Sequence, residues 1–313
     1  MGRVRALCRS EKKGTGKTPI EKAMFEKNHG MVGDAHAGNW HRQVSLLSVE
    51  KIEDFKTAGG DVDFGDFGEN IVVEGYDLSR LPVGSILEIG PTRMRLTQVG
   101  KACHDRCAIY HQVGDCIMPR EGIFAEVLES GEVNVGDGVK VYPPEEDRPF
   151  TAAIITLSDK GARGDREDQS GPLIQARLEA SGQYEVLESR ILSDDPRPLK
   201  TALMELADQR QVDLILTTGG TGFSMRDNTP EATAAVCDRM APGIAEAIRA
   251  YSMTITKRAM LSRATAGIRK GTLIVNLPGS PKACDEALDC ILDTLGHGLE
   301  ILRGSAKDCA RED

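Results

Sequence analysis

A short apolar run that leads straight into a turn rich in glycine and threonine constrains the fold of this chain more than any other feature. Residues 212–216 (VDLIL) are typical of a buried parallel strand, and residues 217–222 (TTGGTG) follow at once. Such a turn leaves backbone N–H groups unpaired at the carboxyl end of the strand, where open α/β sheets bind phosphorylated ligands. Asp227, in the next segment, adds a carboxylate that could hold a metal ion. The glycines alone fit a plain turn equally well.

The second half of the chain alternates between strand-like and helix-like segments. Four apolar runs have the length of buried strands: residues 152–157, 185–191, 212–217 and 272–277. Amphipathic segments of helical length cover Pro172–Ala180, Pro198–Gln209, Pro230–Cys237 and Ala283–Leu302. This alternation predicts an α/β doubly wound domain built on a mostly parallel sheet.

The first half has a different texture. Short runs of valine, isoleucine and leucine are interrupted by glycine, and one helix is expected over Ser48–Thr57. This spacing predicts a β-rich domain, an antiparallel sheet or barrel. Three prolines and four charged residues within 142–149 indicate a linker. We therefore expect one domain over residues 1–142, a linker over 143–149, a second domain over 150–304 and a tail over 305–313.

Composition narrows the class of protein. The chain has 313 residues, enough for two domains, and its 40% hydrophobic and 28% charged residues are typical of a soluble globular protein. A net charge of −9 argues against nucleic acid as the main partner. The sequence shows no signal-peptide core and no apolar stretch of membrane-spanning length, which favours the cytoplasm and no membrane partner. The eight cysteines are then expected to be reduced thiols.

Four further motifs lie in order around the glycine-rich turn. They are residues 154–159 (IITLSD), 168–172 (DQSGP), 193–195 (SDD) and 277–283 (LPGSPKA). Together with residues 217–231 they resemble the signature of the molybdopterin-binding family that includes the molybdopterin adenylyltransferases, over most of residues 150–304. The resemblance implies that this domain binds molybdopterin and ATP with Mg²⁺. The terminal phosphate of molybdopterin would attack the α-phosphate of ATP and release pyrophosphate.

The same resemblance implies roles for particular residues. Asp194 and Asp227 take the positions of functional acidic residues, and would serve catalysis by holding the metal ion or the substrate. Ser158 and Asp159 are expected on the nucleotide side. The residues expected to line the molybdopterin or phosphate pocket are Thr218, Gly219, Gly220, Thr221, Gly222 and, from the facing loop, Ser280.

Local sequence leaves alternatives for the acidic residues. Asp227 could be no more than a helix N-cap, and Arg226 could simply pair with it. Asp194 and Asp195 could form a solvated turn. Their loop lacks the proline expected before the first acid, which leaves the choice between Asp194 and Asp195 open.

The most conspicuous feature of the first half is a cysteine that is flanked by basic residues. Cys103 is flanked by Lys101, His104 and Arg106, surroundings that favour the reactive thiolate, with a buried structural cysteine as the alternative. A zinc site is a second alternative, although the spacing fits no standard closed site. Its ligands would come from Cys103, His104, Cys107, His111 and Cys116. Residues 14–18 (GTGKT) look like the end of a P-loop but lack its first glycine, so we do not expect a nucleotide there.

The residues around this cysteine resemble a MOSC domain over roughly residues 1–142. The shared motifs are residues 33–38 (GDAHAG), 43–47 (QVSLL), 67–71 (FGENI), 81–84 (LPVG), 122–125 (GIFA) and 135–137 (VGD). Such domains resemble β-rich barrels that bind molybdenum cofactor or carry sulfur, and their key cysteine corresponds to Cys103. The resemblance also implies ligand contacts from His36, Arg42 and Asn70.

Both resemblances concern the same cofactor. We therefore interpret the chain as a fusion enzyme of molybdenum cofactor biosynthesis, expected to form a homotrimer and to pass its product to metal-insertion or cofactor-receiving proteins. A non-catalytic carrier of molybdopterin is the alternative. A third hypothesis makes the first half a reductase-like enzyme that uses bound cofactor.

Overall fold

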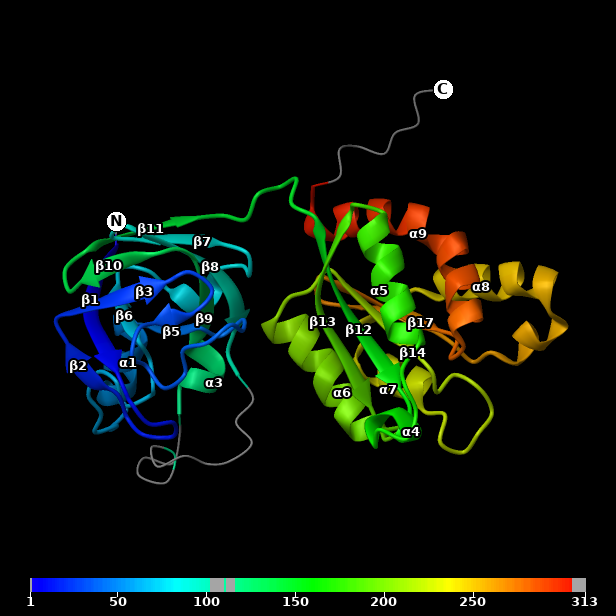
Figure 1. Cartoon of the computed structure of the whole chain (residues 1–313), viewed down its shortest axis with the longest axis horizontal. Helices are drawn as coiled ribbons and strands as arrows, with labels where there is room; N and C mark the ends of the chain where they lie inside the picture. Colours follow the sequence, from blue (N-terminus) through cyan, green and yellow to red (C-terminus); the bar gives the residue numbers. More distant parts are fainter. Residues whose placement is uncertain (1, 102–109, 111–115, 306–313) are drawn as a thin grey trace. The chain divides into compact units, whose positions relative to one another are not determined.

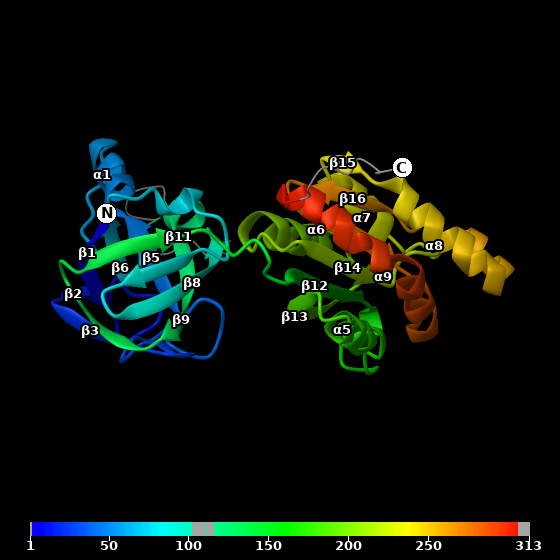
Figure 2. The ribbon, with the colours of Figure 1, turned by 90° about the horizontal axis from the view of Figure 1, so that it is seen from above.

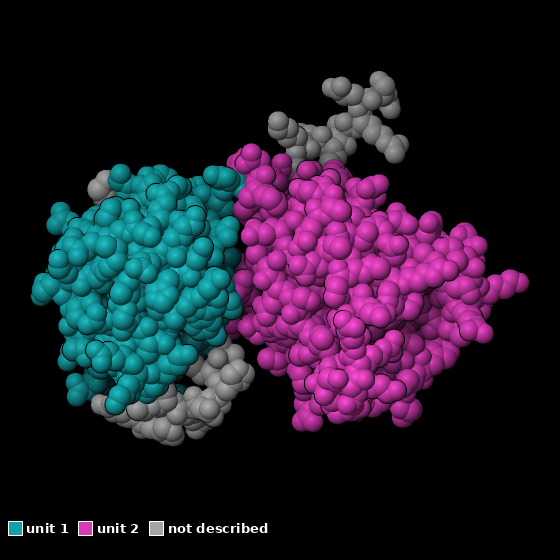
Figure 3. Space-filling model, in the orientation of Figure 1, with its two compact units in different colours: residues 1–145 teal, residues 146–313 magenta. Residues whose placement is uncertain are grey.

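The computed structural model describes residues 2–101, 110 and 116–305. They fall into two compact units, residues 1–145 and residues 146–313 (Figures 1 and 3). Among the described residues, no helix combines the length and the apolar character needed to cross a membrane.

Unit 1 is built on a closed β-sheet. Seven strands follow one another in the order β11-β7-β8-β9-β5-β6-β1, and β11 also pairs with β1, which closes the ring. The pairs in this ring are antiparallel, except that β5 and β6 run parallel. The strands are β1 (Gly2–Arg9), β5 (Val44–Ser48), β6 (Ile71–Glu74), β7 (Ile86–Ile89), β8 (Thr92–Val99), β9 (Ile123–Glu129) and β11 (Gly138–Tyr142). The prediction of a β-rich barrel is confirmed.

Smaller elements complete unit 1. Strand β2 (Thr18–Ile20) pairs with β1, and β3 (Lys22–Glu26), β4 (Gly30–Met31) and β10 (Gly131–Asn134) form a small sheet of their own. The helical segments are α1 (Val49–Thr57), a 3₁₀ turn (Leu78–Arg80) and α3 (Met118–Glu121). Alternate side chains of the barrel strands point inward, and the largest of them, such as Leu7, Leu46 and Met94, are fully buried.

Unit 2 has a sheet of six strands in the described part of the chain, in the order β13-β12-β14-β17-β16-β15. The first four are parallel, whereas β16 and β15 are antiparallel and were not predicted. The strands are β12 (Phe150–Leu157), β13 (Tyr184–Leu192), β14 (Leu214–Thr218), β15 (Arg239–Met240), β16 (Ala266–Arg269) and β17 (Thr272–Leu277). The predicted mostly parallel α/β sheet is confirmed.

Helices cover both faces of this sheet (Figure 2). Ala152 and Ile154 of β12 pack on one side with α5 (Ser170–Ala180), α8 (Pro242–Ile255) and α9 (Pro281–Arg303). Ala153 and Ile155 pack on the other side with α6 (Pro196–Met204) and α7 (Thr229–Val236). Because β12, β14 and β17 are parallel, their carboxyl ends meet at one edge, where the short helix α4 (Asp159–Ala162) also lies.

The helix predicted over residues 198–209 differs in detail. The α-helical hydrogen bonding stops at Met204, and residues Glu205–Gln209 form a π-helical turn in which the Arg210 N–H donates to the Glu205 carbonyl. Leu206 and Ala207 remain buried in that turn. The apolar spacing therefore predicted the buried face correctly but not the change of hydrogen bonding.

Two buried hydroxyls of unit 2 predict opposite responses to removal. The Tyr184 hydroxyl is buried and has no hydrogen-bond partner among the described residues, and burial raises the pKa of Tyr184 to about 12. Removing an unpaired polar group costs little, so Tyr184→Phe is expected to leave the free energy of unfolding unchanged or raise it by up to about 1 kcal/mol. The Thr272 hydroxyl donates to the Val212 carbonyl at 2.6 Å, so Thr272→Val should cost about 1–2 kcal/mol. Urea denaturation followed by far-UV circular dichroism would compare them; equal losses would contradict the prediction.

Candidate functional site

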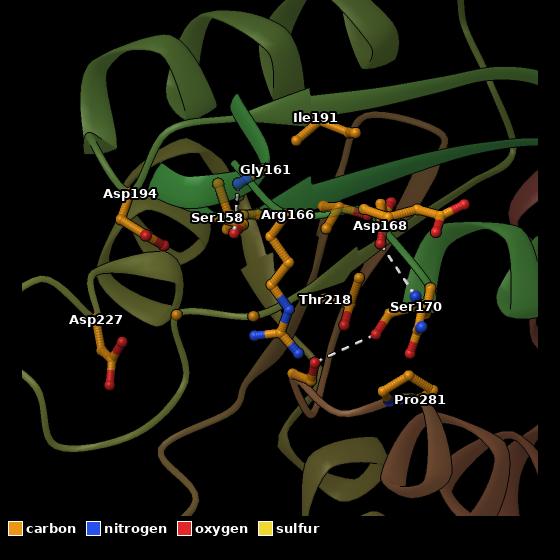
Figure 4. Close-up of a pocket in the computed structure, with 17 residues that line it drawn as sticks. Ser158, Gly161, Arg166, Asp168, Ser170, Ile191, Asp194, Thr218, Asp227 and Pro281 are labelled. Atoms are coloured by element: carbon orange, nitrogen blue, oxygen red, sulfur yellow. Dashed lines mark hydrogen bonds between the residues drawn. The ribbon is translucent and has the colours of Figure 1, made fainter. Parts of the chain in front are cut away.

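A pocket of about 240 Å³ lies at the edge where the parallel strands of unit 2 end (Figure 4). The end of β12 contributes Thr156 and Ser158, and the end of β14 contributes Thr218 with Gly219 and Gly220. Strands also contribute Leu157, the last residue of β12, and Ile191 of β13. The other lining residues come from the loops and short helices around them: Gly161, Arg166, Glu167, Asp168, Gln169, Ser170, Asp194, Asp227, Gly279 and Pro281. The pocket therefore occupies the position in which open α/β sheets bind ligands.

The glycine-rich turn exposes its backbone to this pocket. Gly219 and Gly220 have φ angles of 94° and 65°, a region that side-chain-bearing residues rarely adopt. A Cβ on Gly219 would lie 2.4 Å from the Leu157 carbonyl oxygen, so only glycine fits there. None of the backbone N–H groups of residues 219–222 donates a hydrogen bond to another described residue. Successive unpaired N–H groups form a concavity that binds anions such as phosphate.

The helices that begin near the pocket are capped by their own side chains. Asp168 accepts hydrogen bonds from the Ser170 and Gly171 N–H groups at 3.0 and 3.1 Å, and from the Thr156 hydroxyl at 2.7 Å. The Ser158 hydroxyl likewise accepts from the Gly161 N–H at 3.0 Å. These caps pair the N–H groups of Gly161, Ser170 and Gly171, whereas the N–H groups of Gly219 and Gly220 stay unpaired among the described residues.

The structure distinguishes the two adjacent acids of the acidic loop. Asp194 lines the pocket, and its carboxylate accepts from the Asp159 N–H at 2.9 Å through one oxygen. Asp195 is the N-cap of α6, and its carboxylate accepts from the Arg197 N–H at 2.9 Å. A proline at position 196 starts the helix, which places Asp195 rather than Asp194 at the cap.

Asp227 is not a helix N-cap. The N-cap position of α7 is Asn228, and Asp227 instead accepts from the Ser224 N–H at 3.0 Å, which fixes its own loop. Arg226 does not pair with Asp227 either, because its guanidinium binds the Asp159 carboxylate at 2.7 Å and keeps the pKa of Asp159 low. Asp227 therefore lines the pocket with one carboxylate oxygen that bonds to no described residue.

The pocket carboxylates fit a metal ion whose remaining coordination positions are filled by the substrate. Among the described residues there is no group of three or more His, Cys, Asp or Glu that could hold a metal on its own. Asp194 and Asp227 each keep one carboxylate oxygen without a hydrogen bond to described residues. Mg²⁺ usually takes one or two protein carboxylates and fills its other positions with phosphate oxygens and water. The donor set therefore fits magnesium bound together with a phosphorylated ligand.

Not every expected residue lines this pocket. Of the expected set, Ser158, Thr218, Gly219, Gly220, Asp194 and Asp227 do so. The Thr218 hydroxyl donates to the Pro278 carbonyl at 2.6 Å, so it also holds the facing loop in place. Ser280 does not line the pocket and is instead the N-cap of α9. Its two neighbours, Gly279 and Pro281, do line the pocket. Asp159, Thr221 and Gly222 are not among the lining residues. Arg166, Glu167 and Asp168 line the pocket, although sequence reasoning gave them no role.

A second pocket, of about 260 Å³, lies in unit 1. All three residues that the MOSC resemblance implied as ligand contacts, His36, Arg42 and Asn70, line it together with Lys101. The Arg42 guanidinium lies over the Trp40 ring, 4.8 Å from its centroid, so a cation and an aromatic face stand together in the pocket. The Asn70 side chain is buried and accepts from the Ser45 N–H at 3.1 Å, which gives it a structural task as well.

Cys103, His104, Arg106, Cys107 and His111 lie outside the described residues, so the thiolate and zinc hypotheses stay predictions. The P-loop resemblance of residues 14–18 has a different explanation. Lys17 is buried, and its ammonium group binds the Asp34 carboxylate at 2.8 Å, so it cannot reach a phosphate.

Comparison with known protein families gives one match in each of the two units. Residues 153–297 match the family described as "Probable molybdopterin binding domain", and residues 33–140 match the MOSC domain. Molybdopterin adenylyltransferase of Haemophilus influenzae is 43% identical over 147 residues, which cover 47% of this chain and 75% of that protein. The Helicobacter pylori enzyme of the same name is 37% identical over 156 residues, covering 49% and 87%.

Solved structures match the same half. The molybdopterin biosynthesis enzyme MoaB of Thermus thermophilus is 46% identical and has a TM-score of 0.48, with 50% of this chain and 97% of that chain covered. The relatives thus match the half that carries the glycine-rich turn and both acidic loops. With its C-terminal half, this chain belongs to the molybdopterin adenylyltransferase family, and its N-terminal half is a MOSC domain.

Proposed function

We propose that unit 2 adenylylates molybdopterin with MgATP. The proposal rests on the pocket: the unpaired backbone N–H groups of Gly219 and Gly220 line it together with two acids, Asp194 and Asp227, and each acid keeps one carboxylate oxygen without a hydrogen bond to a described residue. An anion site next to a pair of free carboxylates suits a phosphorylated substrate that arrives with a divalent cation. The names of the relatives that match this half support the same chemistry.

Each part of the pocket has a task in this proposal. The N–H groups of Gly219 and Gly220 would hold phosphate oxygens in line for transfer. Asp194 and Asp227 would hold Mg²⁺, which neutralises charge on the transferred phosphate when it is bound. A phosphate oxygen of molybdopterin forms a bond to the α-phosphorus of ATP, the bond to the β-phosphate breaks, and pyrophosphate leaves. The catalytic contribution of the chain is then positioning and charge compensation.

Charge explains why the cation is required. Four carboxylates (Glu167, Asp168, Asp194 and Asp227) and one guanidinium (Arg166) line the pocket, a formal charge of −3. Without a divalent cation, this lining repels phosphate. Chelation of Mg²⁺ should therefore abolish binding of ATP as well as turnover.

The direct test is pyrophosphate release by the full chain with MgATP, with and without molybdopterin, followed by mass analysis of the pterin. We expect molybdopterin-dependent release and an AMP-linked product. Asp227→Asn should keep the fold and lose most of this activity; full activity would refute its role. Tight molybdopterin binding by the wild-type chain without ATP turnover would instead support the alternative, a non-catalytic carrier.

For unit 1 we propose a cofactor-binding or sulfur-carrying role that involves Cys103. A pocket that gathers His36, Arg42, Asn70 and Lys101, with Lys101 two residues before Cys103, supports it. If Cys103 carries sulfur, cyanide treatment of the full chain should release one thiocyanate per chain, and Cys103→Ala should release none. Retention of molybdenum that depends on Cys103 would point to metal binding, and turnover by that bound cofactor would favour the reductase-like hypothesis.

On the resemblance alone we also propose a homotrimer that acts in the cytoplasm and hands its product to metal-insertion or cofactor-receiving proteins. Sedimentation equilibrium tests the trimer, because a monomer mass at micromolar concentration would rule it out.

A further inference from the structure

Arg166 lies in the loop between α4 and α5, between the sequence motifs at residues 154–159 and 168–172. Among the described residues it is the one lysine or arginine that lines the unit 2 pocket. Figure 4 shows its guanidinium reaching into the middle of the pocket, with Asp194 and Asp227 to one side and Thr218 and Ser170 to the other.

The positive charge of Arg166 is not used by the chain itself. No hydrogen bond or ion pair joins Arg166 to any described residue. Asp168, two residues further along the chain, forms no ion pair with Arg166. Its carboxylate instead accepts hydrogen bonds from the Thr156 hydroxyl and from the Ser170 and Gly171 N–H groups. Other arginines of this region are paired: Arg163 binds Asp165 at 3.0 Å and Arg226 binds Asp159 at 2.7 Å. Arg166 therefore offers an available cation inside an otherwise acidic pocket.

The arrangement of charge indicates which phosphate this cation meets. Two phosphorylated substrates must enter the proposed site, and Asp194 and Asp227 with Mg²⁺ account for the nucleotide. The attacking phosphate of the pterin is also an anion, and it needs a counter-charge in a lining that is formally −3. A guanidinium offers a planar pair of donors that matches phosphate oxygens.

We propose that Arg166 binds the phosphate monoester of the pterin substrate and orients it toward the nucleotide. This inference rests on the proposed function, because it assumes that the pocket holds a phosphorylated pterin. It makes Arg166 a substrate-binding residue that discriminates between the two substrates.

Steady-state kinetics of the full chain test the inference through variants of one residue. For Arg166→Gln we expect the KM for molybdopterin to rise by about 10- to 100-fold, with the KM for ATP within about threefold of the wild type. Arg166→Lys should recover only part of the loss, because an ammonium group cannot make the paired contact. The control is Arg163→Gln, which removes the same charge three residues away, from a side chain that is paired and outside the lining. Equal changes in both KM values, no change, or the same effect in the control would overturn the assignment.

Equilibrium binding separates this inference from the proposed reaction. Calorimetry with Mg²⁺ present would measure the dissociation constants of molybdopterin and of AMP for the wild type and Arg166→Gln. Weaker binding of molybdopterin alone, by about 10- to 100-fold, supports the inference even if the wild-type chain never turns over ATP. An active wild type whose molybdopterin affinity does not depend on Arg166 refutes the inference and leaves the reaction standing. A wild type that binds no molybdopterin refutes both.

Discussion

Asparagine in place of Asp194 is expected to lower kcat for pyrophosphate release by about 100- to 1,000-fold. The substitution keeps an oxygen that can accept from the Asp159 N–H, so the loop should retain its shape. It removes the negative charge that the second oxygen offers to the metal ion. Because positioning and charge compensation supply most of the rate in phosphoryl transfer, the loss should appear in kcat rather than in stability.

The adjacent acid provides a matched control. Asp195→Asn removes the same charge one residue away, and asparagine caps a helix about as well as aspartate. We expect its kcat within about threefold of the wild type. The comparison needs only pyrophosphate release and a thermal melt of both variants. A larger loss for Asp195→Asn than for Asp194→Asn would reverse the assignment of the two acids.

Asp194 and Asp195 also illustrate how much of the site the local sequence can predict. The strand and turn over residues 212–222 were predictable because both signals lie in one segment, and the structure places this turn at the pocket. The sequence motif alone left the choice between Asp194 and Asp195 open, and the structure shows that Asp195 caps α6, which begins at Pro196. A helix-start analysis of the segment 195–198 could have identified Asp195 as the cap.

Contributions from distant loops were harder to predict. Arg166 and Asp168 belong to the loop that leads into α5. They line the pocket together with the end of β14, which lies about fifty residues further along the chain. Asp168 stands two residues before the first residue of α5, and aspartate is a typical residue at helix starts, so the sequence did carry a signal for it. Arg166 carries no local signal at all. Closure of the barrel was equally invisible locally, because it depends on β11 pairing with β1 from the opposite end of the domain.

Glu69 of unit 1 predicts a strong dependence of stability on pH. Its carboxyl group is fully buried; one oxygen accepts from the Gly65 N–H at 2.6 Å, and the other has no partner among the described residues. Burial outweighs that hydrogen bond and the nearby charge of Lys17, and raises the pKa of Glu69 from 4.5 to about 7. Lys17 compensates little because it is already bound to Asp34.

The sign of the effect follows from proton binding. Between about pH 4.5 and 7, folded unit 1 keeps a proton on Glu69 that the unfolded chain has lost, so its free energy of unfolding falls as pH rises. One pKa unit corresponds to about 1.4 kcal/mol, so the ionised side chain costs about 3 kcal/mol above pH 7. Below pH 4.5 both states are protonated and the cost disappears.

Glu69→Gln should remove this dependence, because an amide of the same shape keeps the acceptor for Gly65 and cannot ionise. We expect the variant to match the wild type near pH 4.5 and to exceed its free energy of unfolding by about 3 kcal/mol at pH 8. Trp40, the only tryptophan of the chain, lies in unit 1, so its fluorescence during urea denaturation reports this unit alone. Glu74→Gln removes a charge from an exposed position and should track the wild type at every pH. A constant difference between Glu69→Gln and the wild type from pH 4.5 to 8 would mean that Glu69 is ionised in the folded barrel, with Lys17 as its counter-charge.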